Sequence, residues 1–454
     1  MTPTARQRIW GWFFFDWASQ PYNTLLLTFV FGPYVKEVLG DGTTAQSVWA
    51  TGIGLAGIVI AICAPIFGGM ADTSGNRMPW IWAFSALYVI GAGMLWFAQP
   101  QDFDLYRTLF FFALGLVGME FATIFTNSML PDLGPREQIG RISGNGWAFG
   151  YVGGLIALAL MLALFAQGPD GKTFIGLDPA LGLDPDTREG TRFVGPLTAI
   201  WFMVFMIPFF VFVREPRRRD RPRGSVRTAL RDLGTALREL PQRPSLAAYL
   251  ASSMFYRDAL NAIYGVGGVY AAGVLGWSVV DSGTFGILAI ITGAVFAWLG
   301  GHADTRFGPK PVIATCVWLL TGVSICLVFI SRDSLFGIPL PAGSNLPDIL
   351  FYGLGAVIGA AGGVLQSASR TMMVRQANPA RMTQSFGLYA LAGKATSFVA
   401  PLSIGLVTWM SGSQQIGVTP LIVLFLIGLF LLRYVKSNVE GAEKWSSESS
   451  PVPR

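Results

Sequence analysis

The chain has 454 residues, of which 52% are apolar and only 13% are charged, and its formal net charge is +6. Soluble domains usually contain about 25% charged residues, so this composition excludes an ordinary soluble protein and indicates one that spans a membrane. With a single histidine, and with three cysteines that all lie inside apolar segments, neither a metal site nor a disulfide framework is expected.

Long apolar segments follow one another along most of the chain. A transmembrane helix needs about 20 predominantly apolar residues. Twelve segments meet this requirement: 11–35, 46–70, 79–99, 105–129, 143–167, 194–213, 246–272, 281–301, 311–331, 348–374, 383–409 and 418–435. Their runs of Leu, Phe, Ile and Val favour helices over the strands of a membrane barrel, in which apolar and polar residues alternate. We therefore predict an all-α integral membrane protein with twelve transmembrane helices.

The distribution of positive charge predicts how these helices are oriented. Most of the 32 Lys and Arg residues fall in the loops on the same side as the amino terminus, and the segment 214–245 is especially rich in arginine. Loops rich in Lys and Arg remain in the cytoplasm. We therefore expect a multi-pass protein of the cytoplasmic membrane, with both termini in the cytoplasm.

The same basic segment divides the chain into two halves of six spans each. Apolar residues recur in it at helical spacing, with arginines on other faces, which is typical of an amphipathic helix that lies on an anionic membrane surface. These apolar residues are Val226, Leu230, Leu233, Leu237 and Leu240. The predicted regions are a six-helix bundle (1–213), a basic cytoplasmic linker (214–245), a second six-helix bundle (246–436) and a disordered tail (437–454).

The two halves repeat each other in sequence. "GGMADTSGNR" (68–77) returns as "GGHADTRFGPK" (300–310), which matches Asp72 to Asp304. "FFFDWASQPY" (13–22) returns as "FYRDALNAIY" (255–264), which matches Asp16 to Asp258. A six-helix unit duplicated in parallel is found in transporters whose substrate site lies at the interface of the repeats, near the middle of the membrane.

These motifs also carry a family resemblance. "GGMADTSGNR" resembles the loop 2–3 motif of the major facilitator superfamily, and its second copy differs in having Lys310 at the basic position and Arg306 further forward. Three stretches resemble bacterial members of the vacuole-effluxer family, related to a yeast autophagy-linked vacuolar amino-acid effluxer: "FFFDWASQPYNT", "NSMLPDLGPREQIGRISGNGWAFGYVGG" and "GLYALAGKATSFVAPL". The resemblance implies the major facilitator fold, amino acids as substrates and a cytoplasmic gate. The gate residues it implies are Asp72, Arg77, Arg136, Arg141, Asp304, Arg306 and Lys310.

Charged and polar residues inside the predicted spans are the candidates for a substrate site. A charge at the centre of a membrane helix costs about 2.5–3.5 kcal/mol, so charged side chains there are expected to face one another or water. The charged residues are Asp16, Glu120, Arg257, Asp258, Arg370 and Lys394. At helical spacing from them lie Gln20, Asn23, Asn127, Asn261, Tyr264 and Gln366. Most fall on spans one, four, seven and ten, which line the central cavity in proteins that resemble this one.

This set of charges suits a zwitterionic substrate. Lys394 or Arg257 can bind a carboxylate, while Asp258 or Glu120 can bind an ammonium group. Intramembrane carboxylates also serve as proton relays, so Glu120 or Asp16 could couple transport to protons. A second interpretation of Asp16 is that it only pairs with a base near the cytoplasmic boundary and holds helices together.

Several functional classes are excluded or left open. "GPDGKT" (168–173) lacks the first glycine of a phosphate loop, since Ala166 stands there, and no nucleotide-binding domain is present. We predict a secondary transporter of small solutes, not an enzyme, that works as a monomer by alternating access, without a cofactor or bound nucleic acid. The alternatives are a transporter of lipids, amphiphiles, sugars or drugs on the same fold, and a non-transporting sensor or scaffold that presents the basic linker.

Overall fold

The computed structural model describes residues 3–39, 42–168, 171–215, 226–277, 279–341 and 343–437. Helices make up nearly all of the regular structure, and one short hairpin pairs strand β1 (Ser334–Leu335) with β2 (Ile338–Pro339). Ten helical segments in these residues are long and apolar enough to cross a membrane. The predicted first and seventh spans, outside these ten, are helical too, and each carries at least one charged residue.

The first half of the chain forms six spans. They are α1 (Ala5–Pro21) with the π-helix Tyr22–Phe29 and α2 (Phe31–Leu39), then α3 (Gly42–Ser74), α4 (Met78–Met94), α5 (Leu105–Ser128), α6 (Ile139–Leu164), and α8 (Val194–Phe205) with α9 (Ile207–Phe212). The short α7 (Glu189–Arg192) precedes α8. Between the halves, α10 (Val226–Glu239) occupies the predicted amphipathic segment.

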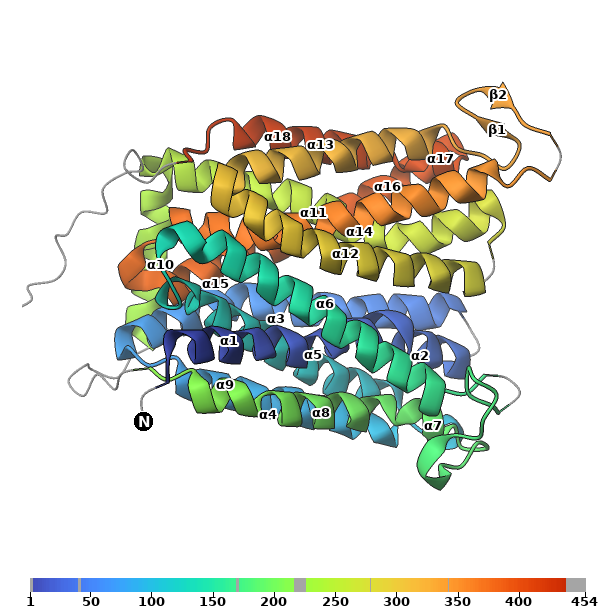
Figure 1. Cartoon of the computed structure of the whole chain (residues 1–454), viewed down its shortest axis with the longest axis horizontal. Coiled ribbons are helices and arrows are strands. Elements are labelled where there is room, and N and C mark those ends of the chain that lie inside the picture. The colour runs from blue at the N-terminus through green and yellow to red at the C-terminus, as the bar shows by residue number, and fades with distance from the viewer. Residues whose placement is uncertain are drawn as a thin grey trace, which may run out of the picture.

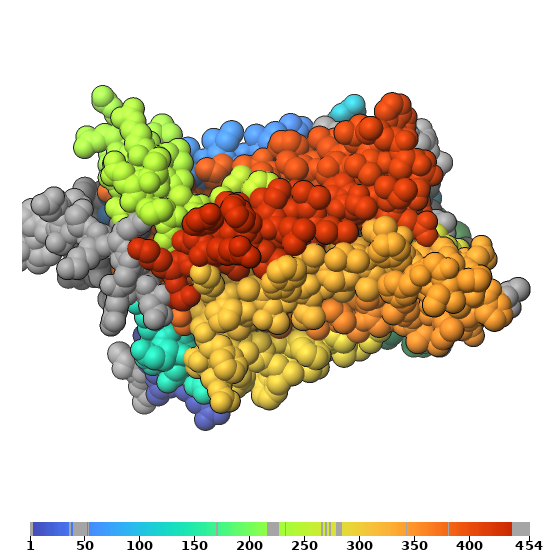
Figure 2. All heavy atoms as spheres, turned by 90° about the horizontal axis from the view of Figure 1, so that it is seen from above, coloured from blue at the N-terminus to red at the C-terminus, as the bar shows by residue number. Residues whose placement is uncertain are grey.

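The second half repeats this arrangement. Its spans are α11 (Pro244–Leu275), α12 (Val279–Phe307), α13 (Pro309–Val328), α14 (Leu346–Gln376), α15 (Met382–Ala395) with α16 (Val399–Ser411), and α17 (Gln414–Gly417) with α18 (Thr419–Leu432). In Figure 1 the helices of the first half lie below and most of those of the second half lie above. The end of the molecule that carries α10 is called the α10 end, and the end that carries α7 and the hairpin is called the α7 end. Figure 2 shows the yellow-green α10 projecting at one end of the molecule.

Three predicted spans are interrupted, and a proline lies at or just after each interruption. Proline has no N–H to donate to the carbonyl four residues earlier, so it weakens an α-helix at that point. Pro21 is the last residue of α1 before the π-helix, and Pro208 follows the break between α8 and α9. Pro401 follows the break between α15 and α16, where its ring deprives the carbonyl of Ser397 of a donor.

The two halves meet backbone to backbone at the α10 end. There α6 packs along α12, and α3 packs along α15. A Cβ on Gly144 would lie 2.5 Å from the Cα of Gly301, so glycine is required at this crossing. Gly387 of α15 similarly faces α3, where a Cβ would lie 2.6 Å from the carbonyl oxygen of Ala64. Small residues let helices approach this closely inside a membrane, and these contacts close the α10 end.

Candidate functional site

An ion pair joins the two halves between α1 and α14. Arg370 donates from Nη1 to Oδ2 of Asp16 at 3.1 Å. The Arg370 side chain is 4% exposed and that of Asp16 is 13% exposed, so the pair is almost completely removed from solvent. Such a pair is strong only if the remaining donors of the guanidinium are also satisfied.

The other donors of Arg370 are satisfied by α5 and α6. Its Nε donates to Oγ of Ser143 at 2.9 Å, and its Nη2 donates to the carbonyl oxygen of Ser143 at 2.7 Å. Its Nη1 also donates to Oδ1 of Asn127 at 3.0 Å. The guanidinium lies 4.6 Å from the ring of Trp12 and 5.7 Å from that of Trp147. With its hydrogen bonds and its faces occupied, Arg370 is held as a fixed link between the halves.

A second ion pair between the halves is more open to solvent. Lys394, in the last turn of α15, donates from Nζ to Oε1 of Glu120 on α5 at 2.9 Å. Their side chains are 30% and 26% exposed. Neither charged group makes a further hydrogen bond in the described part of the chain, although Arg257 is close enough to Glu120 for their charges to interact. Unlike Arg370, both groups therefore have free hydrogen-bonding capacity for a ligand.

Arg257 and Asp258, adjacent on α11, have separate surroundings. Arg257 donates from Nη1 to the carbonyl oxygen of Tyr389 at 3.1 Å, and its guanidinium lies 4.1 Å from the Tyr389 ring centre. Asp258 is buried and accepts a hydrogen bond from the backbone N–H of Ala400 at 2.9 Å. A carboxylate at this point satisfies a free N–H group at the beginning of α16 and stabilises the interrupted span.

The remaining polar residues predicted for the site make no hydrogen bond to these charges within the described residues, and the Tyr264 hydroxyl is paired with Tyr151 of α6 instead. Tyr264 is exposed, and its hydroxyl packs against Gly362 of α14. Its counterpart Tyr22 is buried, packs against Gly115 of α5 and donates to the carbonyl oxygen of Phe112 at 2.5 Å. The others are the exposed Asn261 and the partly buried Gln20, Asn23 and Gln366.

The first copy of the repeated motif connects the two halves at the α10 end. Asp72, in the last turn of α3, accepts hydrogen bonds from the backbone N–H groups of Thr383 at 3.1 Å and Gln384 at 2.8 Å. These residues form the first turn of α15, where helix N–H groups have no partner within the helix and favour a negative charge. The hydroxyl of Thr383 also donates to Oγ of Ser128 on α5 at 3.1 Å. Asp72 thereby fastens α15 to the first half of the chain.

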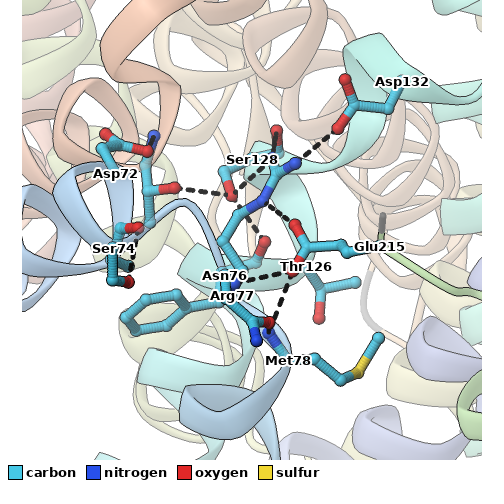
Figure 3. Close-up of polar contacts among 12 residues, drawn as sticks. Asp72, Ser74, Asn76, Arg77, Met78, Thr126, Ser128, Asp132 and Glu215 are labelled. Atoms are coloured by element: carbon cyan, nitrogen blue, oxygen red, sulfur yellow. Dashed lines mark hydrogen bonds and ion pairs between the residues drawn. The ribbon is translucent and has the colours of Figure 1, made fainter. Parts of the chain in front are cut away.

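Arg77, in the α3–α4 turn, organises a cluster of acidic groups beside this contact (Figure 3). It donates from Nε to Oε1 of Glu215 at 2.5 Å, from Nη2 to Oδ2 of Asp132 at 2.5 Å, and from Nη1 to the carbonyl oxygen of Ser128 at 2.6 Å. Burial alone would lower the pKa of Arg77, but Glu215 and Asp132 raise that pKa above its ordinary value, so the residue stays cationic. Glu215 and Asp132 were missed from the sequence because both stand in loops, where acidic residues are common.

The second copy of the motif packs against α6 differently. Asp304 is buried and packs against Gly140 of α6. A Cβ added to Gly140 would lie 2.7 Å from Cγ of Asp304. Thr371 and Arg375 are polar neighbours, yet neither oxygen of Asp304 has a hydrogen-bond partner within the described residues. The next residue, Thr305, accepts a hydrogen bond from the backbone N–H of Arg141 at 2.9 Å.

The other basic residues predicted for the gate lie at its edge. Lys310 donates from Nζ to the carbonyl oxygens of Val435 at 2.6 Å and Arg433 at 3.2 Å, and so ties α13 to the end of α18. Arg136, Arg141 and Arg306 have exposed side chains. No group of three or more His, Cys, Asp or Glu side chains that could hold a metal occurs in the residues the structure describes.

Comparison with known proteins begins with the sequence. Residues 34–444 match the model of a family described as vacuole effluxer Atg22 like. The chain is 24% identical over 432 residues to the uncharacterized MFS-type transporter YxiO of Bacillus subtilis (strain 168), covering 94% of each chain. It is 25% identical over 324 residues to autophagy-related protein 22 of Cryptococcus neoformans (strain JEC21), covering 68% of this chain and 54% of that protein. The chain thus matches about half the length of this fungal relative.

Solved structures of the same fold are more distant in sequence. The human organic anion transporter MFSD10 superposes with a TM-score of 0.66 at 16% identity, covering 95% of this chain and 100% of that chain. The transporter FucP in the outward conformation gives 0.66 at 15% identity, with 94% and 98% covered. A bacterial homologue of the iron transporter ferroportin in an outward-facing state gives 0.67 at 12% identity, with 95% and 98% covered. These likenesses confirm the predicted fold of twelve helices in two six-helix bundles.

Proposed function

Because this chain belongs to the vacuole effluxer Atg22-like family and has the fold of the major facilitator superfamily, we propose that this transporter moves amino acids or similar small zwitterions. The observation that carries the proposal is the ion pair between Glu120 and Lys394. It offers one negative and one positive group, one from each half, at a separation of 2.9 Å and with partial access to solvent.

A zwitterion carries the two charges that this ion pair needs. Its ammonium group can take the place of Lys394 beside Glu120, and its carboxylate can take the place of Glu120 beside Lys394. Each charged group keeps an opposite charge next to it during this exchange, so none is left unpaired in the low dielectric of the membrane. The substrate would then bridge the two halves where the protein's own ion pair bridged them before.

Proton coupling is part of the same proposal. The proton and the substrate's ammonium group compete for Glu120: protonation breaks its ion pair with Lys394, and release of the proton lets Glu120 hold the ammonium group. Glu120 is better suited to this role than Asp16, because Asp16 is held in the solvent-excluded pair with Arg370. Carboxylates inside transporters commonly act as such proton relays.

We also assign the α10 end to the cytoplasm and the chain to the cytoplasmic membrane. The arginines of α10 and of the α3–α4 and α5–α6 connections favour this orientation. The contacts of α3 with α15 and of α6 with α12 would then close the cytoplasmic side, with Asp72 as a gate residue.

The test is a flux measurement with the purified protein in proteoliposomes. A panel of radiolabelled amino acids is offered with and without a pH gradient, to wild type and to Glu120→Gln. Glu137→Gln is the matched control, because Glu137 is an exposed residue of the α5–α6 connection. We expect saturable flux of one or more amino acids that is lost in Glu120→Gln and kept in Glu137→Gln. Absence of flux for the whole panel would contradict the substrate class, and full pH-dependent flux in Glu120→Gln would contradict the site.

A further inference from the structure

A groove opens between α4 and the interrupted span α8–α9, away from the charged site. The two helices touch near the α7 end, where a Cβ on Gly195 would lie 2.5 Å from the carbonyl oxygen of Ala92. Toward the α10 end, stacked rings fill the space between them, first Tyr88 with Phe202 at 3.9 Å and then Trp82 with Phe210 at 3.6 Å. The break in the helix at Met206 leaves a groove of about 570 Å³ between these rings.

The surroundings of this groove identify the medium that covers it. Its lining is almost entirely apolar, and Trp82, Ile90 and Ile207 in its walls are strongly exposed. Both walls belong to segments that are long and apolar enough to span a membrane, so the exposed face is in contact with lipid. The volume lies in the range of about 300–1,000 Å³ that is typical of small-molecule sites.

Two polar features make the groove more than a lipid-facing surface. Ser85, in its wall, is 5% exposed, and its hydroxyl has no hydrogen-bond partner among the described residues. Ser85 follows Trp82 in α4, and at 1.5 Å per residue it lies about 4.5 Å further from the α10 end than Trp82 does. Arg214 is exposed at the α10 end of the groove and donates from Nε to the carbonyl oxygen of Val211, a groove residue, at 3.2 Å. The groove therefore has a cation beside one of its residues and, among the described residues, a buried hydroxyl without a partner in its wall.

We propose that this groove binds one acyl chain of an anionic glycerophospholipid from the leaflet at the α10 end. The phosphate lies at Arg214, and an ester carbonyl accepts a hydrogen bond from Ser85 after rotation of its buried hydroxyl toward the groove. Burying a lipid chain against protein gains little hydrophobic energy inside a bilayer, because the surrounding tails are equally apolar. Shape and the two polar contacts therefore select the lipid, and the positive charge of Arg214 favours an anionic headgroup.

The test uses native mass spectrometry of the full chain in micelles with equal amounts of phosphatidylglycerol and phosphatidylcholine that have identical acyl chains. Arg214→Gln removes the headgroup contact, with Arg306→Gln as control, because Arg306 is an exposed arginine on α12. Ala86→Phe fills the groove, with Ala83→Phe as control, because both alanines are exposed on α4 and only Ala86 lines the groove. We expect wild type to retain phosphatidylglycerol roughly fivefold better than phosphatidylcholine.

The variants separate the proposal from its rivals. Arg214→Gln should remove the preference for phosphatidylglycerol, and Ala86→Phe should lower retention of both lipids, while the two controls behave like wild type. Equal retention of the two lipids by wild type, or equal effects of Arg214→Gln and Arg306→Gln, would overturn the proposal. So would a dimer that Ala86→Phe dissociates, since a second copy would then cover the groove. Arg214→Gln tests the headgroup contact even where Ala86→Phe does not fold.

Discussion

Asp72 and Asp304 occupy equivalent positions in the repeated motif, but their carboxylates have different surroundings. Asp72 accepts hydrogen bonds from two backbone N–H groups at the beginning of α15. Asp304 faces the beginning of α6, and within the described residues no hydrogen bond reaches either of its oxygens. The duplicated sequence therefore gives two junctions of unequal strength.

Replacement of Asp72 tests the stronger junction. Asp72→Ala should destabilise the first turn of α15 by about 0.5–2 kcal/mol, because a helix N-cap contributes that much. Hydrogen exchange of the peptide 382–388 should become about two- to thirtyfold faster, since 1.4 kcal/mol corresponds to a factor of ten. Exchange in α13, which is remote from this turn, serves as the control. Unchanged exchange at Thr383 and Gln384 would show that the two hydrogen bonds are not stabilising.

Replacement of Asp304 tests the weaker junction. A buried carboxylate without donors opposes folding, whereas an amide of the same shape does not carry that cost. We therefore expect Asp304→Asn to unfold at a temperature no lower than wild type in a thermal melt of the detergent-solubilised protein. A drop as large as that of Asp72→Ala would mean that Asp304 has partners as effective as those of Asp72.

The ion pair of Glu120 and Lys394 should matter for transport rather than for stability. Because both side chains are partly exposed, the pair contributes about 0–1 kcal/mol to folding. We expect Glu120→Gln and Lys394→Gln each to melt close to wild type and to lower amino-acid flux at least tenfold. A variant that loses flux only in proportion to the amount of folded protein would assign the pair a structural role instead.

The ion pair of Asp16 and Arg370 should behave in the opposite way. Removing one member of a buried pair leaves an uncompensated charge and costs about 3–5 kcal/mol. Arg370→Met and Asp16→Asn should each lower the free energy of unfolding, measured by denaturant titration in detergent. The double variant should lose less than the two single losses together, because the residues are in direct contact. Strictly additive losses would indicate that the two residues stabilise the fold independently.

The contact between Gly144 and Gly301 should control whether the α10 end closes. A Cβ on Gly144 would meet backbone atoms of both Gly301 and Ala297, which cannot move aside as a side chain can. In a background with Cys63, Cys316 and Cys326 replaced, Gly144→Val should speed maleimide labelling of Ser367→Cys, which is otherwise buried. Gly322→Val is the control, because no atom lies within 4 Å of its Cβ position. Equal labelling of Ser367→Cys in the Gly144→Val and Gly322→Val proteins would mean that α6 and α12 separate at another contact.

The twelve helices were predictable because hydropathy and length report directly on passage through a membrane. The interruptions after Phe205 and Ala395 were not, although Pro208 and Pro401 mark both. A proline in a membrane helix is often accommodated without a break, since neighbouring helices can satisfy the freed carbonyl. A proline therefore marks a place where a helix can be interrupted, and the packing of neighbouring helices decides whether the interruption occurs.

The charged residues of the two ion pairs were recognisable from their cost inside a membrane, but their pairing was not. Which acid meets which base depends on how the helices are arranged in space, and Glu120 of α5 could have faced any of the three bases of the second half. Asp258 was recognisable as a charge inside a span but not as the cap of α16, because the break that it caps was not anticipated. Ser143 was missed because a small neutral hydroxyl in a helix carries no signal of its own.

The eleventh span is built as two pieces that share α11 as a partner, since Arg257 of α11 contacts α15 and Asp258 of α11 contacts α16. Asp258 of α11 holds the beginning of α16, whereas α15 is fastened through Asp72 to α3 and carries Lys394 in its last turn. Residues 396–398 between them interrupt the helix, so α15 and α16 are separate pieces on the same partner helix. One basic and one acidic residue, adjacent on α11, thus hold the span in place on either side of its interruption.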